Sequence, residues 1–159
     1  MDFGKNGGHR HSSVNIVMDI ETQFRNHLLE HGAKTGVQPP ALLLDYLVLL
    51  LSSRLCRTDI IPDPSFAERW LLLHQQPAAS AFLDYADTCL FFTSLLPEYG
   101  HRRGLKLDYY ATLGISAYHT AAGLADELCY RQLGDNFYFL QQFLNSAIKP
   151  EVRLELFKF

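Results

Sequence analysis

The chain has 159 residues, of which 48% are hydrophobic and 19% charged, a balance that fits one globular domain and argues against disorder of the whole chain. Its formal net charge of -3 provides no general attraction for nucleic acid or anionic membranes, and we expect no nucleic acid as a partner. The cysteines, Cys56, Cys89 and Cys129, are dispersed without a C-x-x-C pair, which is typical of reduced cysteines in a cytoplasmic protein.

The chain begins with a polar segment that contains several glycines. Residues 1–11 are predicted to form a flexible leader, and they contain no apolar core of a secretory signal. From Ser13 to about His31, apolar residues recur at spacings of three and four, which predicts an amphipathic helix. We expect Gly32 and Gly36 to end this helix.

Residues 27–31, HLLEH, match the H-x-x-E-H signature of inverted zinc proteases, in which two histidines one helical turn apart bind the metal. A catalytic zinc also needs a third protein ligand, and those enzymes embed the motif in a larger α/β domain. Here His27 and His31 fall in the last predicted turn, where histidine interacts favourably with the C-terminal end of the helix dipole. We therefore favour an ordinary helix end over a metal site, and we expect no cofactor.

Prolines mark the boundaries of the next three predicted helices. A second helix, over about 39–56, is apolar nearly all round and too short to span a membrane. Asp63 and Pro64 are expected to cap and open a third helix, and a fourth runs over about 78–96. Residues 97–106, PEYGHRRGLK, then form the longest polar connection inside the domain.

The remaining sequence predicts two more helices and a short tail. Asp108 is a candidate cap for a fifth helix over about 109–132, and a sixth covers about 136–148. Small residues on the fifth helix would let a neighbouring helix approach closely: Gly114, Ala117, Ala121 and Ala122. We predict an all-α, single-domain, irregular or orthogonal bundle of about six helices over residues 12–150. Residues 151–159 follow as a C-terminal arm, either extended or a last short helix.

Acidic residues within apolar helices are the first candidates for chemistry. Asp45 lies in the second predicted helix, and Asp84 and Asp87 lie three residues apart in the fourth. A carboxylate in such surroundings must be paired, hydrogen-bonded or protonated, and two facing carboxylates could form a general acid/base pair. We favour structural pairing with an arginine or a tyrosine hydroxyl. The arginines considered are Arg54, Arg102 and Arg103.

Two further groups could act on or bind a ligand. His119 lies beside Tyr118 and seven residues before Asp126, so an acid could orient it as a base, but no G-x-S-x-G motif supplies a nucleophile. The segment HRRGLK, residues 101–106, places cations just before a helix and would suit a phosphate or carboxylate. For both groups we favour the simpler interpretation, a core or interface histidine and a solvated loop.

The stretch ADTCLFFTSLLPE, followed by HRRG and DYYATLGISAY, resembles a pattern in uncharacterised bacterial helical proteins, roughly G-D-x-x-L-F-x-x-G-x-F-P-E, R-R and D-Y-Y-x-x-L-G-x-x-A-Y. The resemblance covers residues 86–122. The sequence departs from the pattern at three positions. The pattern has glycine where this chain has Ala86 and Ser94, and phenylalanine where it has Leu96. The resemblance implies a bacterial cytosolic origin and an all-α fold, and it carries no activity.

From these observations we predict a non-catalytic interaction or assembly protein that self-associates or docks on a protein partner. The aromatic content of 13%, the apolar tail LELFKF and the lack of an assembled catalytic set favour this function. The predicted functional surface comprises Asp87, Glu98, Arg102, Arg103, Asp108, Tyr109, Tyr110, Tyr118 and His119.

The alternative is a bundle that binds a small molecule or an anion, or hydrolyses a substrate. It would use a pocket between helices near Asp87, Asp108, Tyr118 and His119, with Arg102 or Arg103 holding the anion. An enclosed polar pocket lined by these residues would favour this alternative over an interaction protein.

Overall fold

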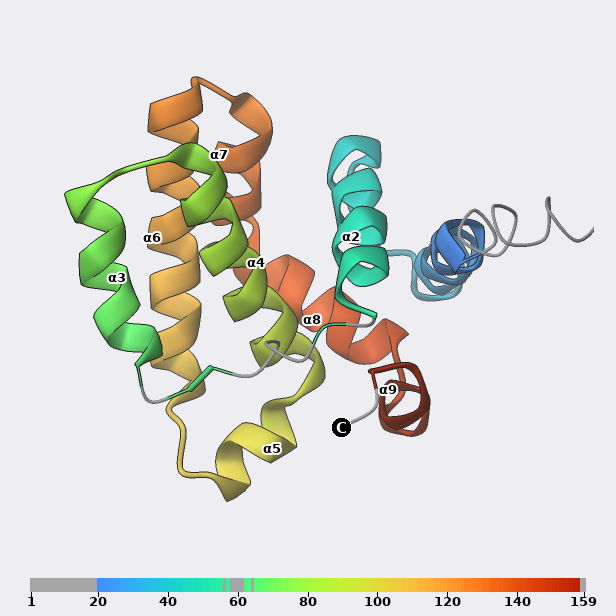
Figure 1. Ribbon diagram of the computed structural model, residues 1–159. Helices are drawn as coiled ribbons and strands as arrows, with labels where there is room; N and C mark the ends of the chain where they lie inside the picture. The colour runs from blue at the N-terminus through green and yellow to red at the C-terminus, as the bar shows by residue number, and fades with distance from the viewer. Residues whose placement is uncertain (1–19, 56, 58–61, 64, 158–159) are drawn as a thin grey trace, which may run out of the picture. The chain divides into compact units, whose positions relative to one another are not determined.

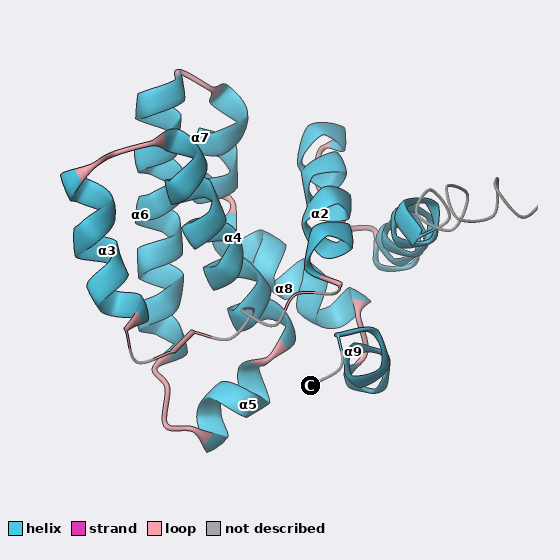
Figure 2. Ribbon diagram, viewed as in Figure 1, coloured by secondary structure: helices cyan, strands magenta, loops and turns pink. Residues whose placement is uncertain are grey.

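The structure, a computed structural model, describes residues 20–55, 57, 62–63 and 65–157 (Figure 1). Within these ranges every regular element is a helix, which confirms the predicted all-α fold (Figure 2). No helix in the described ranges has the length and apolar character needed to cross a bilayer. The predicted leader, residues 1–11, and the predicted start of the first helix at Ser13 lie outside the described residues.

The described residues form nine helices where about six were expected. In chain order, they are one whose described part covers residues 20–35, α2 (Ala41–Arg54), α3 (Phe66–Gln75), α4 (Ala79–Leu95), α5 (Pro97–Arg102), α6 (Leu107–Ala125), α7 (Leu128–Asp135), α8 (Phe137–Ala147) and α9 (Pro150–Phe157). The additional helices are α5 in the predicted loop, α7, which begins within the last five residues of the predicted fifth helix, and α9 in the tail.

Backbone contacts divide the chain into two compact units, with the boundary between Ser52 and Ser53 inside α2. The sequence predicted one bundle over 12–150 and contained no linker that would mark this division. A helix that continues through a boundary leaves no proline, glycine or polar run to signal it.

In the first unit, Gly36 ends the helix over residues 20–35. Its positive φ of 72° is a conformation that glycine adopts without steric cost, and its N–H donates to the carbonyl of Gly32 at 2.9 Å. The prediction that Gly32 also ends the helix is wrong. A Cβ on Gly32 would lie 2.4 Å from Oε1 of Gln38, so this glycine allows a close side-chain contact from inside the helix.

The centre of the second unit is the contact between α4 and α6, which pack against each other more extensively than any other pair of described helices. A Cβ on Gly114 of α6 would lie 2.8 Å from Cβ of Cys89 on α4 and 2.7 Å from the Phe137 ring on α8. The predicted close approach at the small residues of α6 is therefore confirmed. Figure 1 shows α4 and α6 side by side over much of their lengths.

The predicted continuous helix over 109–132 is wrong, because the chain breaks at Asp126. This residue has a positive φ of 52°, and its N–H donates to the carbonyl of Ala122. Aspartate tolerates this left-handed conformation better than most side chains do, so it can end α6 in place of glycine. After the break, α7 packs against α6.

Turn and cap residues also differ from expectation around α3, α5 and α6. Pro97 ends α4 as predicted, but it also occupies the first turn of α5 within the predicted loop. Asp108 lies in the first turn of α6, whose N-cap is Lys106, so it is not the cap. Asp63 accepts hydrogen bonds from the N–H and hydroxyl of Ser65, and α3 begins after Ser65.

The described part of the tail, up to residue 157, belongs to helix α9, the second of the two predicted alternatives, and its Arg153 is 4% exposed. The guanidinium donates to the carbonyl of Ile148 at 2.6 Å, to that of Asn145 at 2.6 Å and to that of Leu95 at 3.1 Å. These acceptors lie at the C-terminal ends of α8 and α4, where helix carbonyls lack partners within the helix. Arg153 therefore joins α9 to the ends of two other helices.

Replacing Gly114 with alanine is expected to lower the free energy of unfolding by about 2 kcal/mol, because the new methyl group would overlap Cys89 and Phe137 in a packed core. Gly123 in the same helix is the control, since a Cβ there would meet no described atom within 4 Å outside its own helix. Gly123→Ala is expected to raise the free energy of unfolding by about 0.5 kcal/mol through helix propensity. Urea unfolding distinguishes the two signs, and an unchanged Gly114→Ala protein would contradict the contact.

Arg153→Met is expected to lower the free energy of unfolding by about 3 kcal/mol, because it leaves three carbonyls without their donor. Arg131→Met, at an exposed position of α7, is the matched control and should change that free energy by less than about 0.5 kcal/mol. Urea unfolding of both variants measures the difference. Equal effects would mean that Arg153 does not hold the helix ends.

Candidate functional site

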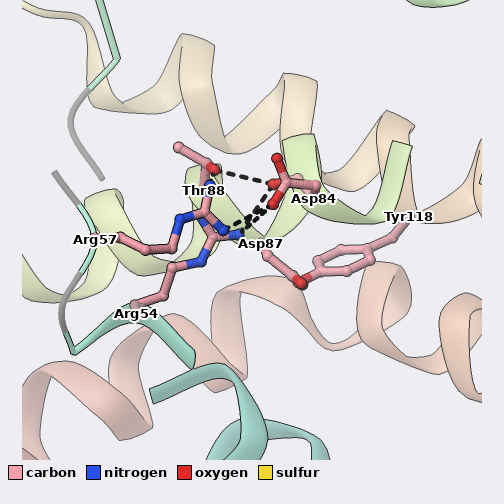
Figure 3. Close-up of polar contacts among 6 residues, drawn as sticks. All are labelled: Arg54, Arg57, Asp84, Asp87, Thr88 and Tyr118. Atoms are coloured by element: carbon pink, nitrogen blue, oxygen red, sulfur yellow. Dashed lines mark hydrogen bonds and ion pairs between the residues drawn. The ribbon is translucent and has the colours of Figure 1, made fainter. Parts of the chain in front are cut away.

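The carboxylate of Asp84 on α4 is held by two arginines, Arg54 at the last position of α2 and Arg57 just after it (Figure 3). Its Oδ1 lies 3.0 Å from Nη2 of Arg54 and 3.0 Å from Nη1 of Arg57. Arg54 is 1% exposed, and its Nη1 also donates to the hydroxyl of Thr88 at 3.0 Å. The hypothesis that a helical aspartate pairs with Arg54 is therefore confirmed, and the cluster joins residues 54–57 to α4.

Asp87, one turn further along α4, is hydrogen-bonded to a tyrosine, as hypothesised. The hydroxyl of Tyr118 on α6 donates to Oδ1 of Asp87 at 2.6 Å, and the Tyr118 side chain is fully buried. Figure 3 shows this contact beside the Asp84 cluster, with Tyr118 pointing toward Asp87. Burial, and secondly the negative charge of Asp87, raise the pKa of the nearby Cys89 thiol. Cys89 is therefore a protonated core residue and not an activated nucleophile.

In the first unit, the third acidic candidate is also paired. Arg25, on the helix over residues 20–35, donates to Asp45 on α2. Both side chains are about half exposed, so the pair contributes little to stability but links the two helices of this unit. A partner for Asp45 was predicted, but Arg25 was not among the predicted partners.

His119 forms the predicted histidine–acid pair with a different acid. Its Nε2 lies 2.9 Å from Oδ1 of Asp135, the last residue of α7. The expected partner Asp126 is excluded because the break there ends α6, and α7 brings Asp135 to the histidine instead. A Cβ on Gly134 would lie 2.5 Å from the His119 ring, so only glycine leaves room for this contact. The pair connects α6 to α7.

The two predicted tyrosines at the start of α6 have different surroundings. Tyr110 is buried, and its ring lies 5.8 Å from the ring centres of both Phe66 and Phe92. Burial raises the pKa of its hydroxyl, which stays protonated at neutral pH. Tyr109 is 48% exposed. Tyr110 is thus part of an aromatic core between α3, α4 and α6, which the sequence analysis did not anticipate.

The predicted cations and acids near residues 98–108 do not share one site. Glu98 and Arg102 line a pocket of about 380 Å³, whereas Asp108 lines a separate pocket of about 300 Å³. The guanidinium carbon of Arg103 lies 4.8 Å from the centre of the Tyr99 ring. Arg153 also lines the pocket of about 380 Å³. It was not among the predicted site residues, although a lone arginine within an apolar tail indicates a side chain with a specific partner.

The predicted pocket near Asp87, Asp108, Tyr118 and His119 is not assembled. Asp87 and Tyr118 are in contact, but Asp108 and Tyr118 are ten residues apart on α6, a separation of about 15 Å along the helix. His119 is bonded to α7 instead. The four residues are therefore divided among separate places in the fold and do not line one ligand site.

HLLEH, residues 27–31, lies inside the helix over residues 20–35. The motif does not occupy the last turn as predicted, because the helix continues to residue 35. Among the described residues, no group of three or more histidine, cysteine or acidic side chains is placed to hold a metal ion. His27 and His31 would therefore need a third ligand from elsewhere.

No protein-family model matches this chain, and neither a curated protein nor a solved structure matches it. The resemblance of residues 86–122 to bacterial helical proteins stays a prediction.

Asp84→Asn is expected to lower the free energy of unfolding by about 2 kcal/mol, because it leaves the buried guanidinium of Arg54 without a charged partner. The value is below that for a fully buried pair, since Asp84 is itself largely exposed. Glu30→Gln, at an exposed helical position, should change that free energy by less than about 0.5 kcal/mol. Chemical unfolding followed by circular dichroism compares the two variants. Unfolding curves with similar midpoints and slopes for both variants would show that the Asp84 carboxylate is not needed to stabilise the buried Arg54.

Proposed function

We propose that this chain is a non-catalytic helical interaction protein that assembles with a second copy of itself through the outer face of α3. The observation that carries the proposal is the exposure of two adjacent leucines, Leu71 at 66% and Leu72 at 58%. Single exposed leucines are ordinary, but neighbouring large apolar side chains on one short helix form a patch of the kind that marks contact sites.

The position of α3 is fixed by aromatic side chains, which supports a preformed surface. The Phe66 ring stacks on Tyr85 with ring centres 4.1 Å apart, and Trp70 meets Phe82 edge-on at 5.8 Å. The Tyr85 hydroxyl also donates to the carbonyl of Phe66 at 2.9 Å. These contacts hold one side of α3 against α4, so the exposed leucines need no rearrangement before they bind.

The contacts of the candidate catalytic residues support the non-catalytic part of the proposal. Asp84, Asp87 and His119 each make a hydrogen bond or ion pair that joins two segments of the fold. A residue engaged in this way contributes to stability, and moving it toward a substrate would break the contact.

A symmetric contact between two copies would bring the same patch together twice. Burying four leucines contributes up to about 2.5 kcal/mol each, roughly 10 kcal/mol in all, and association costs at least about 4 kcal/mol. We therefore expect a weak dimer with a Kd on the order of 100 µM. A cytoplasmic location is part of the proposal, supported by the free thiols of Cys89 and Cys129, and the resemblance of residues 86–122 supports a bacterial origin.

The test is light scattering coupled to size-exclusion chromatography at loading concentrations from about 10 µM to 1 mM, which brackets the expected Kd. The average mass of the wild-type protein should rise with concentration, and the double variant Leu71→Ser, Leu72→Ser should keep the mass of one chain. Leu128→Ser is the matched control, because Leu128 is also 66% exposed but lies on α7. It should behave like the wild type.

A constant wild-type mass of one chain over this range would refute self-association. Loss of assembly in the Leu128→Ser control would place the contact elsewhere. Deletion of residues 151–159 is a poor test of assembly, because it removes Arg153 and with it the donor to three helix-end carbonyls.

A further inference from the structure

A pocket of about 380 Å³ lies between α5 and the start of α9. Its apolar lining comes from Leu95 and Leu96, at the end of α4, and from Pro150, the first residue of α9. Tyr99 on α5 adds an aromatic ring. A volume near the low end of the range for ligand sites, with a largely apolar lining and a few charged groups, is the arrangement expected for a small organic ligand.

Three charged side chains line the pocket, and their charges do not balance. The charge of Arg153 is offset by the three helix-end carbonyls that it contacts and by Glu98, whose Oε2 lies 3.9 Å from its Nη1. Arg102 is exposed, and within the described part of the chain its guanidinium has no hydrogen bond or ion pair. The pocket is therefore apolar with one uncompensated cation.

We propose that this pocket binds a small monocarboxylic acid, with its apolar body against Leu95, Leu96 and Pro150 and its carboxylate on Arg102. A planar guanidinium binds a carboxylate through two parallel hydrogen bonds, which an alcohol or amide cannot reproduce. The volume corresponds to about a dozen water-sized groups, which limits the ligand to roughly that number of heavy atoms. The inference is independent of assembly through α3.

Glu98 provides the negative charge in the pocket, so it opposes the binding of a carboxylate. It lies on the same pocket with its side chain 69% exposed, so it repels an incoming carboxylate while it faces Arg153. Neutralising Glu98 should strengthen the binding of an acid, whereas neutralising Arg102 should weaken it. A cationic ligand would give the opposite pattern for both residues, and a neutral ligand would respond to neither.

The experiment is a titration of the isotope-labelled full chain with 3-phenylpropanoate, followed by two-dimensional NMR of the backbone amides. For a probe of this size the Kd is expected to be on the order of 1 mM. Shifts should concentrate at residues 95–102 and 150–153. The amide 3-phenylpropanamide has the same shape without the charge, and it should bind at least about tenfold more weakly.

Three variants separate a carboxylate site from a general apolar groove. Arg102→Gln should weaken binding of the acid about tenfold, and Glu98→Gln should tighten it about threefold. Arg103→Gln is the matched control, since Arg103 is the neighbouring residue but lies over the Tyr99 ring and does not line the pocket. It should leave the Kd within about twofold of the wild type. Unchanged amide shifts elsewhere confirm that each variant is folded.

Three results would each overturn the proposal. One is the absence of shifts at residues 95–102 up to 20 mM acid. Another is equal affinity for the acid and its amide. The third is a Kd that Arg102→Gln and Arg103→Gln change to the same extent.

Discussion

The close contact between α4 and α6 is the constraint on which the second unit depends. At Gly114 the backbone of α6 approaches Cys89 so closely that a methyl group would not fit, and the Phe137 ring of α8 fills the space on the same side. Three helices are therefore held together at one position. The hydrogen bond between Tyr118 and Asp87 connects the same pair of helices one turn further along α6. The polar contact is possible because the small residue has already brought the backbones together.

Two buried arginines attach the outer segments to this central pair. Arg54, the last residue of α2, contacts Asp84 and Thr88 on α4, and Arg153 joins α9 to the ends of α4 and α8 through backbone carbonyls. A buried charge contributes little net stability, but a wrong arrangement would leave it unpaired at a high energetic cost. These residues therefore specify which segments meet more than they strengthen the fold. Asp84, which pairs with Arg54, looks like a catalytic candidate in the sequence because it is a carboxylate in an apolar helix.

Much of the helical architecture was predictable because it depends on local patterns. Apolar periodicity and the prolines at 39, 40, 77 and 97 locate the helices, and the small residues of α6 indicate its tight neighbour. The break at Asp126 was not predictable, since a single aspartate in a left-handed conformation leaves no pattern in the flanking residues. That break also decides the partner of His119, so an error in one element became an error in the candidate site.

The remaining site residues required knowledge of packing. That Asp84 and Asp87 need partners follows from their position in apolar helices, and the kinds of partner were predictable from charge and hydrogen bonding. Which predicted residues share a pocket was not, because Glu98 and Arg102 meet Arg153 only when α9 returns to the end of α4. Contacts over more than fifty residues of sequence carry no local signal.

Arg153 also sets an order of events during synthesis on the ribosome. The carbonyl of Leu95 emerges 58 residues before the side chain that becomes its donor. At about 5 to 20 residues per second, this interval lasts roughly 3 to 12 s. In roughly the second half of that interval, after Ala125 has been made, α4 and α6 are both available to pair, while the far end of α4 still awaits its last donor. The nascent chain must therefore pass through a state with a formed centre and an open end, in which chaperones and proteases compete with completion of the fold.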